Sequence, residues 1–145
     1  MFGLPEYLSE RCKRGNTRDI GTSGPVVVWL KSSLRTEENP AIDAARIIAH
    51  ELNLPLFIYQ GIDERYPHAS LRHHNMLLDA SVDMYDGAKR IGVDYYLHVA
   101  RVDNRQSVMK ELSEQASLII TDLFPLPPWK DWVENVAQNA TCAFI

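Results

Sequence analysis

Several familiar sequence signals are scarce or missing, and each gap excludes a class of protein. The 145-residue chain has two cysteines, Cys12 and Cys142, far apart and outside any metal-type pair, so we expect two reduced thiols in a cytoplasmic protein. No apolar run approaches the roughly 20 residues that a membrane helix needs. The first residues lack the apolar core of a signal peptide. The formal net charge of −4 argues against bulk electrostatic binding, and we expect no direct contact with nucleic acid.

Glycine-rich phosphate loops and common catalytic motifs are also missing. No Gly-x-Gly-x-x-Gly or Gly-Lys-Ser/Thr follows the first apolar run. The sequence therefore lacks the glycine-lined loop by which dinucleotide-binding proteins and NTP hydrolases usually approach phosphate groups. No Gly-x-Ser-x-Gly elbow marks a serine nucleophile. His73 and His74 are adjacent, so on a helix their rings point about 100° apart and form no two-ligand face. We therefore expect no metal site.

The composition that remains is that of an ordinary globular domain, with 46% hydrophobic and 23% charged residues. We expect a leader over residues 1–24, with a short helix from Glu6 to Lys13, and one domain over residues 25–145. The leader holds a basic cluster, Arg11, Lys13, Arg14 and Arg18. That cluster can contact a phosphate or remain solvated. The solvated reading is favoured, because the acidic remainder offers no continuing basic groove.

Residues 25–52 organise the chain. The unbroken apolar run Val26–Leu30 predicts a strand covered on both faces, in the middle of a parallel sheet. Asn39 can cap a following helix, and Pro40 fits its first position. Apolar residues at helical spacing give that helix one buried face: Ala41, Ala44, Ala45, Ile48, Ala49 and Leu52.

The same alternation of strand and helix continues to the last residue. Further strands are predicted at 54–59, 93–100, 117–121 and 141–145, and a polar loop at 60–70. Helices are predicted at 71–90, at 107–116 and from Trp129 onward. In the longest helix six residues repeat at helical spacing, and Gly92 can end it: Leu71, His74, Leu78, Val82, Tyr85 and Ala88. This order predicts a Rossmann-like three-layer α/β/α fold with an open parallel five-stranded sheet.

Candidate binding residues follow the predicted strand ends, where open α/β sheets bind their ligands. Ser32 and Ser33 can donate hydrogen bonds to a ligand or turn and cap their own loop. Asp122 can face the crevice or cap the proline-containing loop that follows it. Asp63 and Glu64 can act as acid or base, although a solvated loop acid is far commoner.

Two motifs resemble the DNA photolyase and cryptochrome family, most closely its class II members. The first runs over Gly24-Pro25-Val26-Val27-Val28-Trp29, Lys31-Ser32-Ser33-Leu34-Arg35 and Asn39-Pro40-Ala41. The second is Thr121-Asp122-Leu123-Phe124-Pro125-Leu126, similar to the family's Thr-Asp-x-x-Pro-Leu. Lys31 stands where the family usually has Arg, and Ser33 and Glu38 stand where it usually has Asp.

The resemblance implies the amino-terminal α/β domain of an enzyme for light-dependent repair of pyrimidine dimers, with strand order 3-2-1-4-5. In many members this domain holds an antenna chromophore, either a deazaflavin, FMN or methenyltetrahydrofolate. Catalysis belongs to a helical FAD-binding domain, so FAD is not expected on this chain. A separate or missing FAD-binding domain is then the implied partner. The implied antenna contacts are Trp29, Lys31, Ser32, Ser33, Arg35, Gln60, Asp63, Asp122 and Phe124.

These contacts predict a crevice between the loops 31–35, 60–64 and 122–125. Arg35 can present a planar fork to a carboxylate or phosphate, and Trp29 and Phe124 can face a flat ring, although Trp29 fits a core position equally well. Ser33 in place of Asp removes a charge that would orient Arg35, which predicts low affinity. Two other functions stay open. One is a nucleotide-binding protein of the universal-stress or electron-transfer-flavoprotein type, and the other is an interaction module without a ligand.

Overall fold

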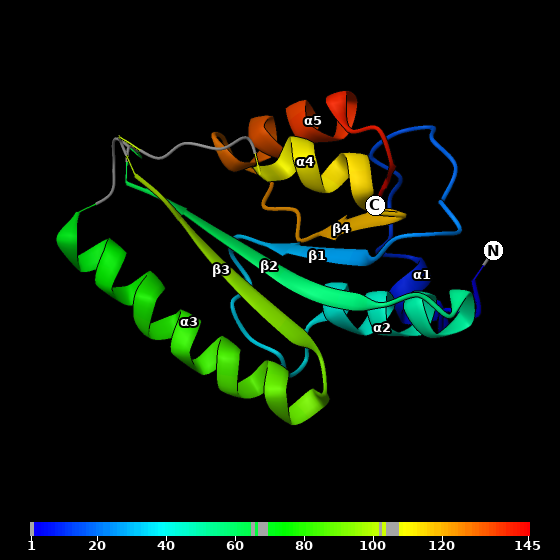
Figure 1. Cartoon of the computed structure of the whole chain (residues 1–145), viewed down its shortest axis with the longest axis horizontal. Helices are drawn as coiled ribbons and strands as arrows, with labels where there is room; N and C mark the ends of the chain where they lie inside the picture. Colours follow the sequence, from blue (N-terminus) through cyan, green and yellow to red (C-terminus); the bar gives the residue numbers. More distant parts are fainter. Residues whose placement is uncertain (1, 65, 67–69, 102, 104–107) are drawn as a thin grey trace.

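A parallel sheet runs through the middle of the molecule (Figure 1). The computed structural model describes residues 2–64, 66, 70–101, 103 and 108–145. In that part of the chain the five strands are β1 (Val26–Leu30), β2 (Leu56–Asp63), β3 (Asp94–Ala100), β4 (Leu118–Thr121) and β5 (Ala143–Phe144). Their order is β3-β2-β1-β4-β5, and every neighbouring pair is parallel. The predicted Rossmann-like fold, its strand order and the central place of Val26–Leu30 are confirmed.

Helices cover both faces of the sheet (Figure 1). On one face lie α2 (Pro40–Leu52) and α3 (Leu71–Ile91), and on the other lie α4 (Val108–Gln115) and α5 (Trp129–Asn139). The short α1 (Glu6–Ser9) precedes β1, and the amide of Gly3 just before it donates to Glu51 Oε1 of α2 at 2.9 Å. None of the helices in the described ranges combines the length and apolarity needed to cross a bilayer.

Strand β1 divides the core in two, because its alternate side chains point to opposite faces of the sheet. Val26, Val28 and Leu30 pack with residues of α2 and α3. Val27 and Trp29 pack with residues of α5. All five residues of β1 are buried, which is why the strand shows no polar alternation in the sequence.

The predicted start of α2 is confirmed in detail. Asn39 Oδ1 accepts hydrogen bonds from the amides of Ala41 and Ile42 at 3.1 and 3.4 Å, and Pro40 is the first helical residue. Asn39 Nδ2 donates to the carbonyls of Ser33 and Arg35 at 3.0 and 2.9 Å. This single buried side chain therefore fixes both the helix and the loop before it.

Strand β2 is longer than the sequence predicts. The prediction of a loop from residue 60 onward is wrong for Gln60–Asp63, which belong to β2 and pair with Leu97–Ala100 of β3. Pairing with the edge strand outweighs the weak strand propensity of these residues, a tertiary effect that no local pattern reveals. Residues 65 and 67–69 of the predicted loop lie outside the described residues.

Helix α3 is confirmed, with Gly92 following it at φ 70° in the left-handed conformation. The apolar repeat that predicts it, however, lies largely on its outer side: Leu71, Leu78, Val82 and Tyr85 are all exposed. The buried side consists of Ser81, Met84, Gly87 and Ala88. A Cβ on Gly87 would lie 2.3 Å from Thr36 Oγ1, so small residues let this side approach the loop after β1 closely.

The segment before β1 is tied to the last strand. Asn16 Nδ2 donates to the carbonyls of Ala137 and Cys142 at 3.1 and 3.0 Å, and its Oδ1 accepts from the amide of Phe144 at 3.2 Å. The amide of Gly15 donates to the carbonyl of Phe144 at 2.8 Å. The predicted early helix is α1, which ends at Ser9 rather than at Lys13.

Candidate functional site

A cavity of about 1040 Å³ opens where β1, β2 and β3 end, between the amino-terminal turns of α3 and α5. Six of the nine predicted contact residues line it: Trp29, Lys31, Ser32, Gln60, Asp63 and Phe124. The other three, Ser33, Arg35 and Asp122, are not among its lining residues. Its position agrees with the general rule for open α/β sheets, in which ligands bind outside the carboxyl ends of the strands.

Asp122 binds the loop after β1 instead of facing the cavity. Its carboxylate accepts hydrogen bonds from the amides of Lys31, Ser32 and Ser33 at 3.2, 2.8 and 2.7 Å, and from the Ser32 hydroxyl. Burial alone would raise the pKa of Asp122. The Lys31 ammonium, the Ser32 hydroxyl and the two serine amides outweigh that effect and hold the pKa below its ordinary value. Asp122 is therefore a carboxylate that positions the loop.

Lys31 connects this loop to the cavity wall. Its Nζ lies 3.2 Å from Asp122 Oδ1, donates to the Thr121 hydroxyl, and sits 4.1 Å from the centroid of the Trp29 ring. Burial lowers the pKa of Lys31, and the nearby Asp122 carboxylate opposes that shift. The ammonium is thus held by a carboxylate, a hydroxyl and an aromatic face at the edge of the cavity.

Arg35 points along its own loop, where its Nη2 donates to the carbonyl of Glu38 at 3.1 Å. Ser33 donates its amide to Asp122 and accepts at its carbonyl from Asn39. Both residues therefore shape the turn between β1 and α2. Their predicted contact with a ligand stays a prediction.

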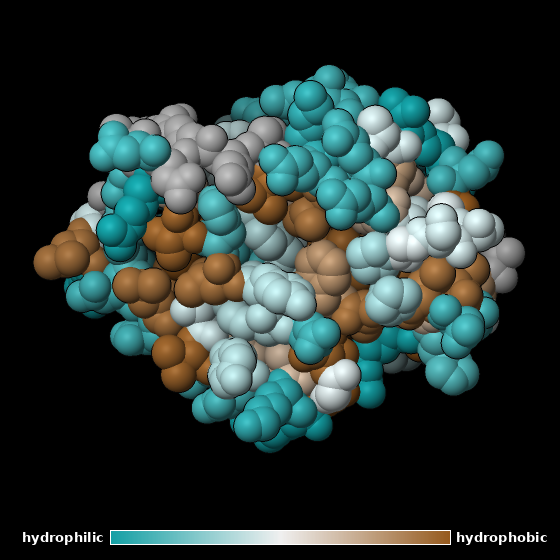
Figure 2. All heavy atoms as spheres, viewed as in Figure 1, coloured by the Kyte–Doolittle hydropathy of each residue, from teal (hydrophilic) through white to brown (hydrophobic). Residues whose placement is uncertain are grey.

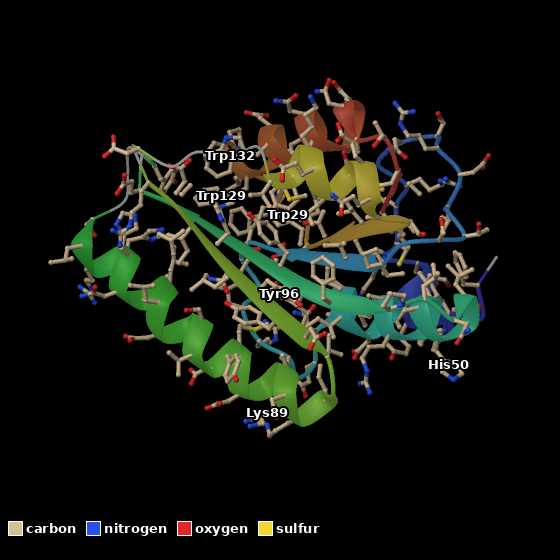
Figure 3. The ribbon with its side chains drawn as sticks, in the orientation of Figure 1. Trp29, His50, Lys89, Tyr96, Trp129 and Trp132 are labelled. Carbon is tan, nitrogen blue, oxygen red and sulfur yellow. The ribbon has the colours of Figure 1, made fainter. Side chains whose placement is uncertain are left out.

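Aromatic rings form one wall of the cavity. Trp129 lies 5.5 Å from Phe124, 5.7 Å from Tyr66 and 6.1 Å from Trp132, measured between ring centroids. Tyr66 also contacts His73 at 5.8 Å. Figure 3 shows Trp29, Trp129 and Trp132 close together at this end of the sheet. Side chains of this kind suit a flat, apolar ligand.

Within the described part of the chain, three buried nitrogen atoms on the cavity lining have no hydrogen-bond partner: Gln60 Nε2, His74 Nε2 and His98 Nε2. Gln60 is 2% exposed, and its Oε1 accepts from the Tyr95 hydroxyl at 2.7 Å, which leaves Nε2 as the free donor. Burial raises the pKa of Tyr95 to about 12, so this phenol stays neutral and can donate. Because unpaired buried polar groups are costly, three in one cavity indicate a ligand with matching polar atoms.

The two histidines and the tryptophans of α5 were not among the sequence candidates. His98 lies opposite Gly61 in the register of β2 and β3, a position that only the longer β2 reveals. The sequence predicts only a helix from Trp129 onward and a helical repeat that contains His74. In the described ranges no group of three or more His, Cys, Asp or Glu residues could hold a metal ion.

The fold and the cavity define a Rossmann-like α/β domain with a ligand-sized pocket beside its central strands. By sequence the chain is related to photolyases: it is 28% identical over 130 residues to the deoxyribodipyrimidine photo-lyase of Methanothermobacter thermautotrophicus, covering 89% of this chain and 28% of that protein. The resemblance to the photolyase family predicted from the two motifs is confirmed. No family model matches the chain.

Solved structures agree on the fold. A bacterial class III photolyase from Agrobacterium tumefaciens superposes with a TM-score of 0.63 at 18% identity, over 80% of this chain and 23% of that one. A universal stress protein solved in complex with cAMP gives a TM-score of 0.51 at 20% identity, over 85% of this chain and 95% of that one. The chain thus spans about a quarter of the length of the photolyases that it matches.

Proposed function

We propose that this chain is a photolyase-type antenna domain, which binds a flat aromatic chromophore in the cavity at the carboxyl ends of β1, β2 and β3. The carrying observation is the pairing of an aromatic wall with three buried nitrogen atoms that lack partners. A deazaflavin, FMN and methenyltetrahydrofolate all combine flat rings with polar ring atoms. The relation to photolyases supports this class of ligand over others.

The lining residues divide into two groups by what they offer a ligand. Trp129, Phe124 and Trp29 offer aromatic rings. The Lys31 ammonium also lies against the Trp29 ring. Gln60 offers an amide donor fixed by Tyr95, while His74 and His98 offer imidazole nitrogens. When bound, such a chromophore supplies light absorption. The residues of the chain orient it and exclude water from its ring edges.

The activity of the full photolyases is part of the same proposal. Light-dependent repair of pyrimidine dimers needs a flavin. We therefore propose that the chain acts together with a separate or missing FAD-binding domain. In that arrangement the chain is not catalytic alone, and FAD does not bind to it.

Direct titration tests the proposal. Purified chain is titrated by calorimetry with a deazaflavin, FMN, methenyltetrahydrofolate and, as the competing ligand class, AMP. We expect one of the three chromophores to bind with the highest affinity. His98→Ala should weaken binding by about tenfold or more, because a polar atom of the ligand loses its hydrogen-bond partner. The matched control His50→Ala changes an exposed histidine of α2 that Figure 3 shows far from the tryptophans, and it should leave binding unchanged.

Two further results would change the assignment. Loss of binding in Arg35→Ala, with His98→Ala unaffected, would place the ligand against the loop after β1, as the sequence alone predicts. Tight AMP binding without chromophore binding would favour a nucleotide-binding protein of the universal-stress type. If none of the four compounds binds, the proposal is wrong, and the interaction module is favoured.

A further inference from the structure

Strand β3 leaves one edge of the sheet open. It is the first strand in the order β3-β2-β1-β4-β5, and its seven residues pair with β2 on one side (Figure 1). Among the described residues, the backbone hydrogen bonds of Asp94–Ala100 go to β2 and to Glu64, which follows it, so the outer amides and carbonyls of β3 have no partner there. An unpaired strand edge of this length can pair with a further strand.

The two edges of the sheet differ in how they are protected. At the β5 edge, the amide of Gly15 donates to the carbonyl of Phe144, and Asn16 accepts from the amide of Phe144. Strand β3 contains no proline and no lysine, which are the residues that usually block an edge. Its one charged residue, Asp94, stands at its first position. The β3 edge is therefore open to strand pairing, whereas the β5 edge is occupied by the leader.

Apolar side chains gather at the open edge. Tyr96, Leu97 and Val99 of β3 are 55%, 38% and 40% exposed. Figure 2 shows apolar atoms over the region of α3 and β3. Exposed apolar side chains beside unpaired backbone groups mark a surface that pairs with another strand.

Helix α3 directs an apolar stripe toward the same edge. Gly87 approaches Thr36 in the loop after β1. At about 100° per residue, going around the helix from Gly87, the buried Met84 and Ala88 come next and the stripe follows. Because Met84 and Ala88 face the sheet, the stripe lies on the side of α3 turned away from the loop after β1, toward the outside of β3. The exposed residues of this stripe are Leu71, Leu78, Val82 and Tyr85.

We infer that two copies of this chain pair through their β3 strands, antiparallel, about a twofold axis at Leu97. Leu97 is the central residue of Asp94–Ala100, so this register pairs all seven residues and continues the sheet from one copy into the other. The one charge of the strand, on Asp94, then lies opposite Ala100. No charges of the same sign oppose each other in the strand pair.

The side chains of the paired strands match in kind. On the side of α3, Leu97 meets Leu97 of the second copy, and Tyr95 lies opposite Val99. On the other side, Tyr96, which packs edge-on against Phe57 at 5.2 Å, lies opposite His98. Aromatic and β-branched residues directly opposite each other stabilise an antiparallel strand pair.

The same axis brings the two α3 stripes together. Helix α3 packs on β2 and β3, and neighbouring strands are about 4.8 Å apart. A helix above the middle of this pair lies about 5 Å from an axis just outside β3, so the two α3 axes lie about 10 Å apart. Packed helices have interaxial distances of about 8–10 Å. Strand pairing at β3 therefore places the two helices in contact.

Along the helix, the axis falls near Met84. Leu97 lies about 10 Å from the start of β3, and the antiparallel α3 covers that length in about seven residues back from Ile91. Val82 and Tyr85, the stripe residues on either side of Met84, therefore meet the same residues of the second copy. A strand from an unrelated protein would pair with the edge and leave the stripe exposed. The second copy covers both surfaces, which is why we assign it as the occupant.

Sedimentation of the purified chain over a wide concentration range tests the pairing. We expect a monomer–dimer equilibrium. Leu97→Lys places two like charges at the axis and should raise the dissociation constant at least about tenfold. Val82→Ser should raise it as well, because it removes an apolar contact between the helices. The matched control Leu126→Lys changes an exposed leucine that follows β4, and it should leave the equilibrium unchanged. Circular dichroism checks that each variant is folded.

Disulfide trapping tests the register. In Leu97→Cys the two thiols lie directly opposite each other, within the distance that a disulfide spans, so mild oxidation should link this variant into covalent dimers. Val99→Cys is the matched control on the same side of β3. Its two thiols would lie about 13 Å apart along the strands and should not be linked. The unchanged chain, with Cys12 and Cys142, gives the background.

Three outcomes would overturn the inference. The chain could remain monomeric at every concentration, which would leave the open edge without this occupant. A dimer could form that Leu126→Lys dissolves and Leu97→Lys does not, which would place the interface on another surface. Val99→Cys could also be linked as fast as Leu97→Cys, which would contradict a twofold axis at Leu97.

Discussion

Asp122 shows how one side chain holds two distant parts of the molecule together. It follows β4, yet its carboxylate is bound almost entirely by the loop that leaves β1, through three amides, a hydroxyl and the Lys31 ammonium. Buried carboxylates are tolerated when they are paired and accept several hydrogen bonds. The two loops at the point where the sheet order reverses are therefore joined, and the ligand cavity lies to one side of this junction.

Replacing Asp122 by Asn should destabilise the chain by about 3 kcal/mol near neutral pH, because Lys31 loses its buried partner. The folded pKa of Asp122 lies below its unfolded value of about 3.9. Its contribution is therefore complete above pH ~4 and is lost as the pH falls through the folded pKa. Urea unfolding of both proteins from neutral pH downward should show the difference shrinking only in that acidic range. The exposed control Glu134→Gln should show no comparable difference.

Asn16 should also matter more than its position in the leader suggests. Asn16→Ala removes hydrogen bonds to two carbonyls and to the amide of Phe144, so we expect a loss of about 1–3 kcal/mol in the free energy of unfolding. Asn139→Ala is the matched control, because Asn139 is exposed and, in the described ranges, its side chain bonds only to Asn135 one turn earlier. Equal stability of the two variants in chemical denaturation would contradict this role for Asn16.

At the scale of elements, the entry into β1 depends on a glycine. Gly24 has φ 111°, and a Cβ there would lie 2.2 Å from the carbonyl oxygen of Gln115. Backbone atoms cannot move aside as a flexible side chain can. The glycine of the Gly-Pro-Val-Val-x-Trp motif is thus explained by close packing against the end of α4.

Gly24→Ala should therefore destabilise the chain by more than Gly92→Ala. The Gly92 variant bears only the conformational cost of φ 70°, about 1 kcal/mol, since no atom lies within 4 Å of its added Cβ. The Gly24 variant bears a similar conformational cost and a clash with the backbone of Gln115. Thermal unfolding of the two variants side by side measures the difference, and equal losses would contradict the steric explanation.

Elements with local signals were predictable from the sequence, and those that depend on distant partners were not. The buried run of β1, the Asn39 cap and the Gly92 terminus each carry their signal within a few residues. The extension of β2 through Asp63 arises from pairing with β3, whose partner residues lie more than 30 positions away. The apolar repeat of α3 predicts the helix but lies largely on its exposed side, because apolar spacing reports a helix and not which side packs inward.

The candidate site was predictable to the same partial extent. Motif resemblance and strand ends gave six lining residues, among them Trp29 and Gln60. His98 and His74 could not be found this way, since their relevance comes from burial without a partner, which appears only in three dimensions. Conversely, Asp122 and Arg35 carry the family motif, and here both contact the loop after β1.

At the scale of the whole molecule, the fully buried strand β1 lies at the centre of the sheet, where the order in which strands are added reverses. Strands β2 and β3 follow on one side of β1, and β4 and β5 on the other. Loops that leave β1 and β4 therefore separate at the carboxyl edge, a geometry that favours a ligand site there. The chain nonetheless spans only about a quarter of the photolyases related to it.

We predict that the chain alone does not repair pyrimidine dimers under illumination. Electron transfer requires a bound flavin, and we propose that the flavin belongs to another domain. The test illuminates damaged DNA with the purified chain and added reduced FAD, and measures dimers restored. A photolyase that contains its own FAD domain serves as the positive control. Repeated turnover by the chain would show that it carries catalytic residues of its own.

The grouping of aromatic residues has a spectroscopic consequence. All three tryptophans, Trp29, Trp129 and Trp132, line the same cavity, so the intrinsic emission of the protein originates from one place. Trp29 is 8% exposed and Trp132 is 43% exposed, so a quencher dissolved in water should reach Trp132 far more readily than Trp29. A chromophore bound between them would instead quench the emission of all three, because it accepts their excitation energy. Selective quenching of the tryptophan emission by a dissolved quencher therefore indicates an open cavity. Quenching of all the emission by a bound chromophore indicates a filled one, and neither measurement needs a label.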